Sequence, residues 1–134
     1  MLVYRVETDN KNQGPYAGRI GLDFDRHFNR ETHPGITCDI EEYSREQYHK
    51  YFNNGPYYCA CDSLIKLIDW FSEEWKAIIN SGKAYIAIYD SQDILHSYSG
   101  KQVAFKFDTA ELQERFPASE FVAKLREALT PSAV

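Results

Sequence analysis

Apolar and polar side chains alternate at the start of the chain, where Leu2, Tyr4 and Val6 share one face of an extended segment. This period of two predicts a β-strand over 2–7, which we expect to be central in its sheet. Later segments either alternate in the same way or are apolar throughout, and both patterns are typical of strands. The further predicted strands cover 57–61, 84–89 and 102–107.

A spacing of three and four between apolar positions follows the second predicted strand and predicts one long amphipathic helix over 63–80. Asp62 or Ser63 can cap the free N–H groups at its start. Gly82 can adopt the left-handed backbone conformation that commonly ends a helix. Weaker patterns predict a helix over 39–52, a short helix after the capping-box spacing of 108 and 111, and a last helix over 119–129.

These elements together predict a single α+β domain over 1–129 with a frayed tail over 130–134. We expect a small, mainly antiparallel or mixed sheet, one long amphipathic helix, C-terminal helices and long N-terminal loops. The region before position 57 shows little regular pattern, and loops of such length in a compact domain are often functional.

The composition narrows the class of protein. The chain has 134 residues, of which 43% are hydrophobic and 15% aromatic, which is enough for a core without metal or disulfide staples. No apolar run approaches the roughly 20 residues of a membrane span, and no signal-peptide pattern opens the chain. We therefore expect a protein of the cytoplasm, or of a host's cytoplasm.

The charge bears on the choice of partner. The net charge is −5, and the basic residues are scattered, so we predict no direct binding to nucleic acid and none to membranes. An acidic chain can approach a basic protein surface, although solubility is the simpler explanation of its charge.

Few residues suggest chemistry. Arg5 lies inside an apolar strand, where its guanidinium could hold a phosphate or a carboxylate, and the simpler interpretation is an ion pair with Glu7 or another acid. Cys59 and Cys61 would lie on one face of a strand, but free cysteine is common in protein cores and this spacing is unusual for structural zinc. We predict no metal site.

Tyrosines are concentrated in the middle of the chain. They can form a protein-binding face, because tyrosine offers a large contact area, or they can be half-buried packing residues with satisfied hydroxyl groups. The candidates for a protein-binding face are Tyr43, Tyr48, Tyr51 and Tyr57.

Five short motifs occur in a distinctive order along the chain. They are Tyr4-Arg5-Val6-Glu7, Gly14-Pro15-Tyr16, His33-Pro34, a segment ending in Trp70-Phe71, and Gly100-Lys101-Gln102-Val103-Ala104-Phe105. Over 2–107 the chain thereby resembles a group of small bacteriophage and prophage proteins. The resemblance implies a mobile-element origin and no settled activity.

The order of strands and helix is also similar, more loosely, to the ADP-ribosyltransferase fold. That resemblance implies NAD as the cofactor and a site made of Arg5 on a phosphate, Tyr58 or Ser63 after the middle strand, and Gln102. Gln102 falls where that family carries its catalytic glutamate, and an amide cannot act as a carboxylate toward a developing sugar cation. Transfer would therefore need Glu111 or Asp108 in its place.

Three functional hypotheses remain open, of which the third is a structural or assembly protein that self-associates through an exposed apolar patch. In the first, the chain is a small acidic phage-type protein without a cofactor that binds a host protein and inhibits or redirects it, for example as an anti-defence, anti-CRISPR-like inhibitor. In the alternative, it is an ADP-ribosyltransferase-like enzyme or a degenerate NAD-binding relative. Small size, acidic charge, many tyrosines and the lack of a specific catalytic motif favour the non-enzymatic hypothesis.

Overall fold

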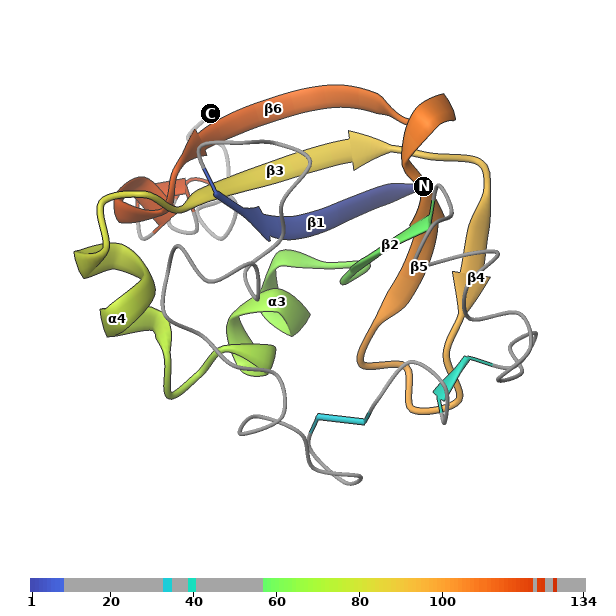
Figure 1. Ribbon diagram of the computed structural model, residues 1–134, viewed down its shortest axis with the longest axis horizontal. Coiled ribbons are helices and arrows are strands. Elements are labelled where there is room, and N and C mark those ends of the chain that lie inside the picture. Colours follow the sequence, from blue (N-terminus) through green and yellow to red (C-terminus); the bar gives the residue numbers. More distant parts are fainter. Residues whose placement is uncertain (9–32, 35–38, 41–56, 122, 125–126, 128–134) are drawn as a thin grey trace, which may run out of the picture.

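A computed structural model of the chain describes residues 1–8, 33–34, 39–40, 57–121, 123–124 and 127 (Figure 1). In chain order, the strands of this described part are β1 (Leu2–Glu7), β2 (Tyr57–Ala60), β3 (Tyr85–Asp90), β4 (Ile94–His96), β5 (Val103–Lys106) and β6 (Glu111–Pro117). The helices α3 (Leu64–Trp70) and α4 (Trp75–Asn80) lie between β2 and β3 in the chain. The 3-10 turns η3 (Phe107–Thr109) and η4 (Ala118–Glu120) flank β6.

The strands form two antiparallel sheets, with the order β1-β3-β6 in the first and β2-β5-β4 in the second. The sheets meet where Tyr4 and Cys61 exchange two backbone hydrogen bonds of 2.8 Å, so the end of β2 continues alongside β1. This arrangement confirms the predicted α+β class and the antiparallel sheet. The central strand of the first sheet is β3, and not β1 as the sequence pattern predicts.

The first sheet packs on both of its faces. Side chains alternate between the faces of a strand, so β1 contributes to two separate hydrophobic clusters. On one face Val6 and Ile86 pack with Trp75 of the helices, and on the other Val3 packs with Phe105 of the second sheet. Figure 1 shows α3 and α4 toward one end of the first sheet, with β4 and β5 running steeply across its other end.

The structure divides the predicted helix over 63–80 into α3 and α4. The side chain of Ser63 caps the start of α3 by accepting a hydrogen bond of 3.1 Å from the backbone N–H of Lys66. Near the other end, the Trp75 indole donates a 2.9 Å hydrogen bond to the carbonyl of Ile68. That carbonyl therefore has a partner outside the helix, which stabilises the break.

The segment after η3 is a strand, so the prediction of a short helix from the Asp108 to Glu111 spacing is wrong. Glu111 opens β6, and Phe116 near its end pairs with Ile86 of β3 and packs into the helix-side cluster. These long-range contacts override the local capping signal. The segment over 90–100, predicted as loop, contains the short strand β4, which forms by pairing with β5.

Several predictions lie outside the described residues. They include the helix over 39–52 beyond its first two positions, the structure of the loops over 9–32 and the tail over 130–134. Residues 121, 123, 124 and 127 are helical, in the region of the predicted last helix. In the part of the chain that the structure describes, no helix has the length and apolar character needed to cross a bilayer.

Candidate functional site

Four charged or polar side chains meet between the two sheets. Arg5 Nε lies 3.3 Å from Glu7 Oε2, and Arg115 Nε donates a 3.2 Å hydrogen bond to Glu7 Oε1. The Tyr89 hydroxyl donates to Glu7 Oε2 over 2.6 Å. Glu7 is 0% and Arg5 is 4% exposed. We call these four residues the inter-sheet charge cluster.

The strand register brings the cluster together. Arg5 of β1 lies opposite Ala87 of β3, and Ala87 lies opposite Arg115 of β6, so a small side chain separates two arginines in one row. Glu7 is two positions beyond Arg5 on the same face of β1, and Tyr89 is two positions beyond Ala87 on β3. The pleat of the sheet therefore points all four side chains toward the second sheet.

Burial shifts the protonation equilibria of the cluster. It lowers the pKa of Arg5, and the negative charge of Glu7 opposes that effect. Burial, together with the hydrogen bond to Glu7, raises the pKa of Tyr89 far above its ordinary value, so the phenol remains a neutral donor. Among the described residues, one carboxylate thus faces two guanidinium groups, which leaves one positive charge in excess within the cluster.

Aromatic rings cover both arginines. The guanidinium carbon of Arg5 lies 4.7 Å from the ring centroid of Tyr58 and 5.8 Å from that of Phe107. The guanidinium carbon of Arg115 lies 4.0 Å from the ring centroid of Tyr85. Such cation–π contacts partly replace the hydration that each cation loses on burial.

The structure brings together two of the ligand-binding candidates, Arg5 and Tyr58, and gives the others separate roles. Ser63 caps α3. Gln102, the candidate catalytic residue, is buried and donates from its amide to the carbonyl of Pro34 at 2.8 Å and to Asp39 Oδ2 at 2.9 Å. These contacts make Gln102 a structural donor that holds two distant segments to the start of β5.

Asp39 is the acceptor that organises the loop between β4 and β5. Its Oδ1 accepts from the backbone N–H of Ser99 at 2.9 Å, and its Oδ2 accepts from the Ser99 hydroxyl at 2.7 Å. Its own carbonyl accepts from the Tyr98 N–H at 2.6 Å. The Asp39 side chain is buried, so these hydrogen bonds hold the loop against the interior of the protein.

The two described cysteines differ in exposure. Cys59 is exposed on β2, whereas Cys61 is buried, with its sulfur 3.4 Å from the carbonyl oxygen of Lys101. Burial raises the pKa of the Cys61 thiol to about 12. Among the described residues, no group of three or more His, Cys, Asp or Glu side chains is placed to hold a metal ion.

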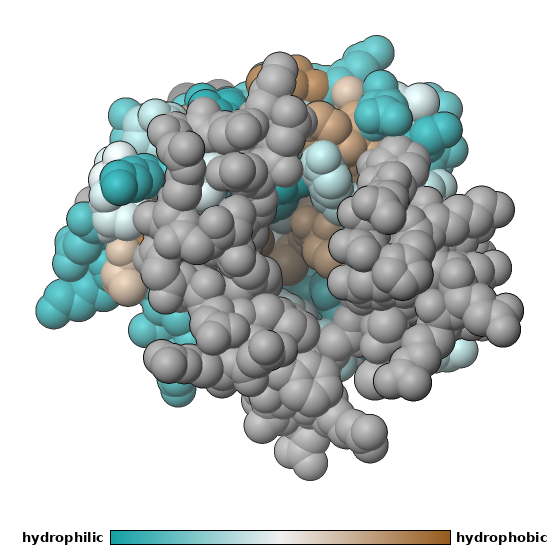
Figure 2. All heavy atoms as spheres, viewed as in Figure 1, coloured by the Kyte–Doolittle hydropathy of each residue, from teal (hydrophilic) through white to brown (hydrophobic). Residues whose placement is uncertain are grey.

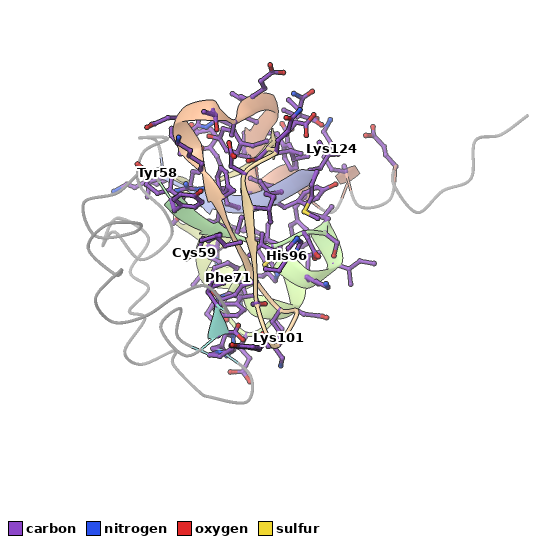
Figure 3. The ribbon with its side chains drawn as sticks, turned by 90° about the vertical axis from the view of Figure 1, so that its right-hand side faces the viewer. Tyr58, Cys59, Phe71, His96, Lys101 and Lys124 are labelled. Carbon is purple, nitrogen blue, oxygen red and sulfur yellow. The ribbon has the colours of Figure 1, made fainter. Side chains whose placement is uncertain are left out.

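The tyrosines predicted to bind protein are mostly outside the described residues. Tyr43, Tyr48 and Tyr51 fall there, and Tyr57 is half-buried at the start of β2. Figure 3 shows the neighbouring Tyr58 at the margin of the second sheet.

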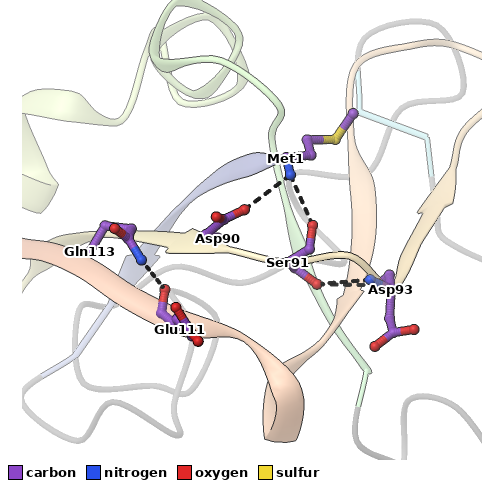
Figure 4. Close-up of polar contacts among 6 residues, drawn as sticks. All are labelled: Met1, Asp90, Ser91, Asp93, Glu111 and Gln113. Carbon is purple, nitrogen blue, oxygen red and sulfur yellow. Dashed lines mark hydrogen bonds and ion pairs between the residues drawn. The ribbon is translucent and has the colours of Figure 1, made fainter.

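One end of the first sheet presents apolar and acidic side chains together. Leu2 lies opposite Asp90, and Asp90 lies opposite Glu111, so three strands contribute to one row. Met1, Leu2 and Leu112 are 50%, 44% and 46% exposed. The amino group of Met1 donates to Asp90 Oδ1 over 3.0 Å (Figure 4). We call these five residues the sheet-end patch. Figure 2 shows hydrophobic atoms at the surface beside hydrophilic ones near the top of the view.

Sequence reasoning identified Arg5 and its pairing with Glu7, but missed Tyr89, Arg115 and the sheet-end patch. The available signal was weak. Tyr89 ends an apolar strand, and Arg115 follows the polar pair Gln113-Glu114, so it resembles part of an ordinary solvated segment. Only the pairing of β1, β3 and β6 shows that these residues meet.

Comparison with known proteins gives one family. A family model described as "Bacteriophage T4 Y00F protein" matches residues 1–119 of the chain. No curated protein and no solved structure matches the chain.

Proposed function

Because this chain belongs to the Bacteriophage T4 Y00F protein family, we propose that it is a small phage protein that binds a host protein and inhibits or redirects it. The observation that carries this proposal is the sheet-end patch. Its partner in the proposal is a host protein with a basic surface.

The apolar part of the patch is concentrated. Of the described chain's exposed large hydrophobic residues, Met1, Leu2 and Leu112 occur together at this one end of the sheet. Single exposed apolar side chains are normal on protein surfaces, but several around one end of a sheet mark a candidate interaction site. Leu2 is opposite Asp90 and Leu112 is opposite Tyr89, so the two leucines border this end from opposite faces of the sheet. Burying them against a partner would supply the hydrophobic contribution to affinity.

The charged part of the patch selects the kind of partner. Asp90 and Glu111 stand in the same row as Leu2, and the exposed Asp93 and Asp108 follow in the adjacent loops. Local negative charge of this kind speeds association with a positive surface and disfavours acidic partners. A basic host surface that normally holds nucleic acid has the complementary charge.

The patch is held rigidly before any partner arrives. Met1 donates to the carbonyl of Ser91 at 3.0 Å, and the Ser91 hydroxyl accepts from the backbone N–H of Asp93 at 3.2 Å (Figure 4). The hydroxyl of Thr109 donates to Asp93 Oδ2 at 2.8 Å, which ties the loops after β3 and β5 together. A preorganised surface loses less entropy on binding, so its contacts contribute more to affinity.

The proposal is tested by affinity capture from a lysate of host cells, followed by calorimetry with the purified partner. The test variant is Glu111→Lys combined with Leu112→Asp. The matched control is Glu73→Lys, a charge reversal at an exposed position in the turn between α3 and α4. We expect the control to retain the partner and the patch variant to lose affinity at least about tenfold, which corresponds to about 1.4 kcal/mol.

Added salt should weaken the wild-type complex, because part of the attraction is between exposed charges. The proposal fails if no partner is enriched over a control bait. It also fails if the patch variant and Glu73→Lys bind the same partner with equal affinity.

A further inference from the structure

We infer that the inter-sheet charge cluster binds one oxyanion, a carboxylate or a phosphate group, through the guanidinium of Arg5 beneath the ring of Tyr58. This inference is independent of the proposed host-protein contact, which uses the sheet-end patch. It rests on the charge count of the cluster, on the hydrogen bonds of its two arginines and on the position of Tyr58.

The charge count comes first. Among the described residues, Glu7 is the acid that pairs with both Arg5 and Arg115, and its two oxygens are shared between them. Tyr89 adds a neutral donor to the same carboxylate. A buried cation without a full counter-charge is costly in a protein interior, and a bound anion would remove that cost.

The two arginines differ in how their N–H groups are used. Arg115 donates from Nε to Glu7 and from Nη2 to the carbonyl of Thr8 at 2.7 Å. Arg5 is within ion-pair distance of Glu7 through Nε only, and its buried Nη1 has no hydrogen-bond acceptor among the described residues. Arg115 is therefore a structural group of the cluster, whereas Arg5 keeps donors for another acceptor.

The chemistry of the guanidinium sets the class of ligand. It is planar and always charged at physiological pH, and it presents paired N–H groups that match the two oxygens of a carboxylate or phosphate. Buried donors of this kind gain most from a charged acceptor, because water does not compete with it.

The ring of Tyr58 covers one face of the Arg5 guanidinium. Its ring lies directly over the guanidinium and contacts Phe107 at a centroid distance of 4.7 Å. It is half-buried, and within the described part of the chain no hydrogen bond holds its hydroxyl group. Rotation of the ring would uncover Arg5 at the expense of the cation–π and aromatic contacts, without breaking a strand pair.

The test is titration of the full-length protein with sodium phosphate, sodium acetate and, as a control, sodium chloride at matched ionic strength. The readouts are the Nε–Hε resonance of Arg5 in NMR spectra and the melting temperature. We expect a saturable shift of that resonance and a higher melting temperature with phosphate, acetate or both, but not with chloride. A response to phosphate alone assigns the site to phosphate groups, and a response to acetate alone assigns it to carboxylates.

Two variants separate the site from general salt effects. Arg5→Lys keeps the charge beside Glu7 but lacks the paired donors, so the dissociation constant should rise at least about tenfold while the fold is retained. Lys83→Arg, an exchange between the same two cations at an exposed position before β3, is the control and should bind the anion as the wild type does. The inference is overturned if neither anion gives a saturable response, or if Arg5→Lys responds as strongly as the wild type.

Discussion

Tyr89 donates its hydroxyl hydrogen to Glu7 over 2.6 Å, and this bond joins the central strand of the first sheet to the end of β1. The two residues are 82 positions apart in the chain. The same carboxylate pairs with Arg5 and Arg115 and is fully buried. Glu7 therefore supplies the negative charge that offsets the burial of the two guanidinium groups between the sheets.

Glu7→Gln should destabilise the protein strongly, because it leaves the buried guanidinium of Arg5 and the half-buried one of Arg115 without their counter-ion. We expect a loss of about 3 kcal/mol in the free energy of unfolding, measured by urea denaturation. The control is Glu114→Gln, which removes the 2.6 Å contact with Lys124 at the surface and should have a much smaller effect. Equal effects of the two substitutions would show that the cluster does not stabilise the fold.

Tyr89→Phe should change how stability depends on alkaline pH. The pKa of Tyr89 is raised above its ordinary value of 10.0, so the neutral phenol is favoured in the native state. Its contribution is complete below pH 10.0 and is lost as the pH rises above that value toward the native pKa. Below that range, removing a hydrogen bond to a charged group should cost about 1.5–3 kcal/mol.

The measurement for Tyr89→Phe is urea denaturation repeated between neutral and strongly alkaline pH. The loss of stability at high pH should be smaller in Tyr89→Phe than in the wild type. Tyr85→Phe, on the same strand but with its ring against Arg115, should retain the wild-type profile. If Tyr89→Phe loses stability with pH as steeply as the wild type, the raised pKa is not responsible.

Ser63→Ala should weaken the start of α3, because the side chain of Ser63 accepts the hydrogen bond of a free backbone N–H there. The expected loss is about 1 kcal/mol. Ser72→Ala, at an exposed position in the turn after α3, is the control. Thermal unfolding of the two variants in parallel measures the difference, and a Ser72 effect as large as that of Ser63 would rule out a specific cap.

Asp39→Ala should loosen the loop between β4 and β5. It removes the acceptor of the Ser99 N–H and hydroxyl and one acceptor of the buried Gln102 amide. An unsatisfied buried donor costs about 1–3 kcal/mol, which applies to Gln102, whereas the exposed Ser99 can bond to water instead. Hydrogen exchange should accelerate at the Ser99 amide, while the Ile86 amide in the central strand should remain protected if the fold persists. Unchanged exchange at Ser99 would show that Asp39 does not hold the loop.

Local patterns predicted the strands that have strong signals. The alternation over 2–7 matches β1, and the apolar run over 84–89 matches β3 to within one residue. These segments are buried on one face or on both, so their periodicity records the environment of each side chain. The α+β class follows from the order of such segments.

The remaining elements depend on contacts that no local pattern records. The break between α3 and α4 depends on Trp75 reaching the carbonyl of Ile68, and β6 depends on Phe116 meeting Ile86. Both override signals that favour helix. The same limit applies to the candidate site. Arg5 and Glu7 are two positions apart, and their ion pair was one of the alternatives that the sequence offered for Arg5, whereas Arg115 lies 108 positions from Glu7.

The place of β1 in the sheets has a consequence for the order of events in the cell. The ribosome makes β1 before its partners Cys61 and β3, and the arginine that completes the Glu7 ion pairs comes later still. Such distant pairings are slow to form, because a long loop must close before they contribute stability. The first sheet is therefore completed only after β6 has been made, and until β3 is made the β1 strand, with its apolar face, has no sheet partner in the nascent chain.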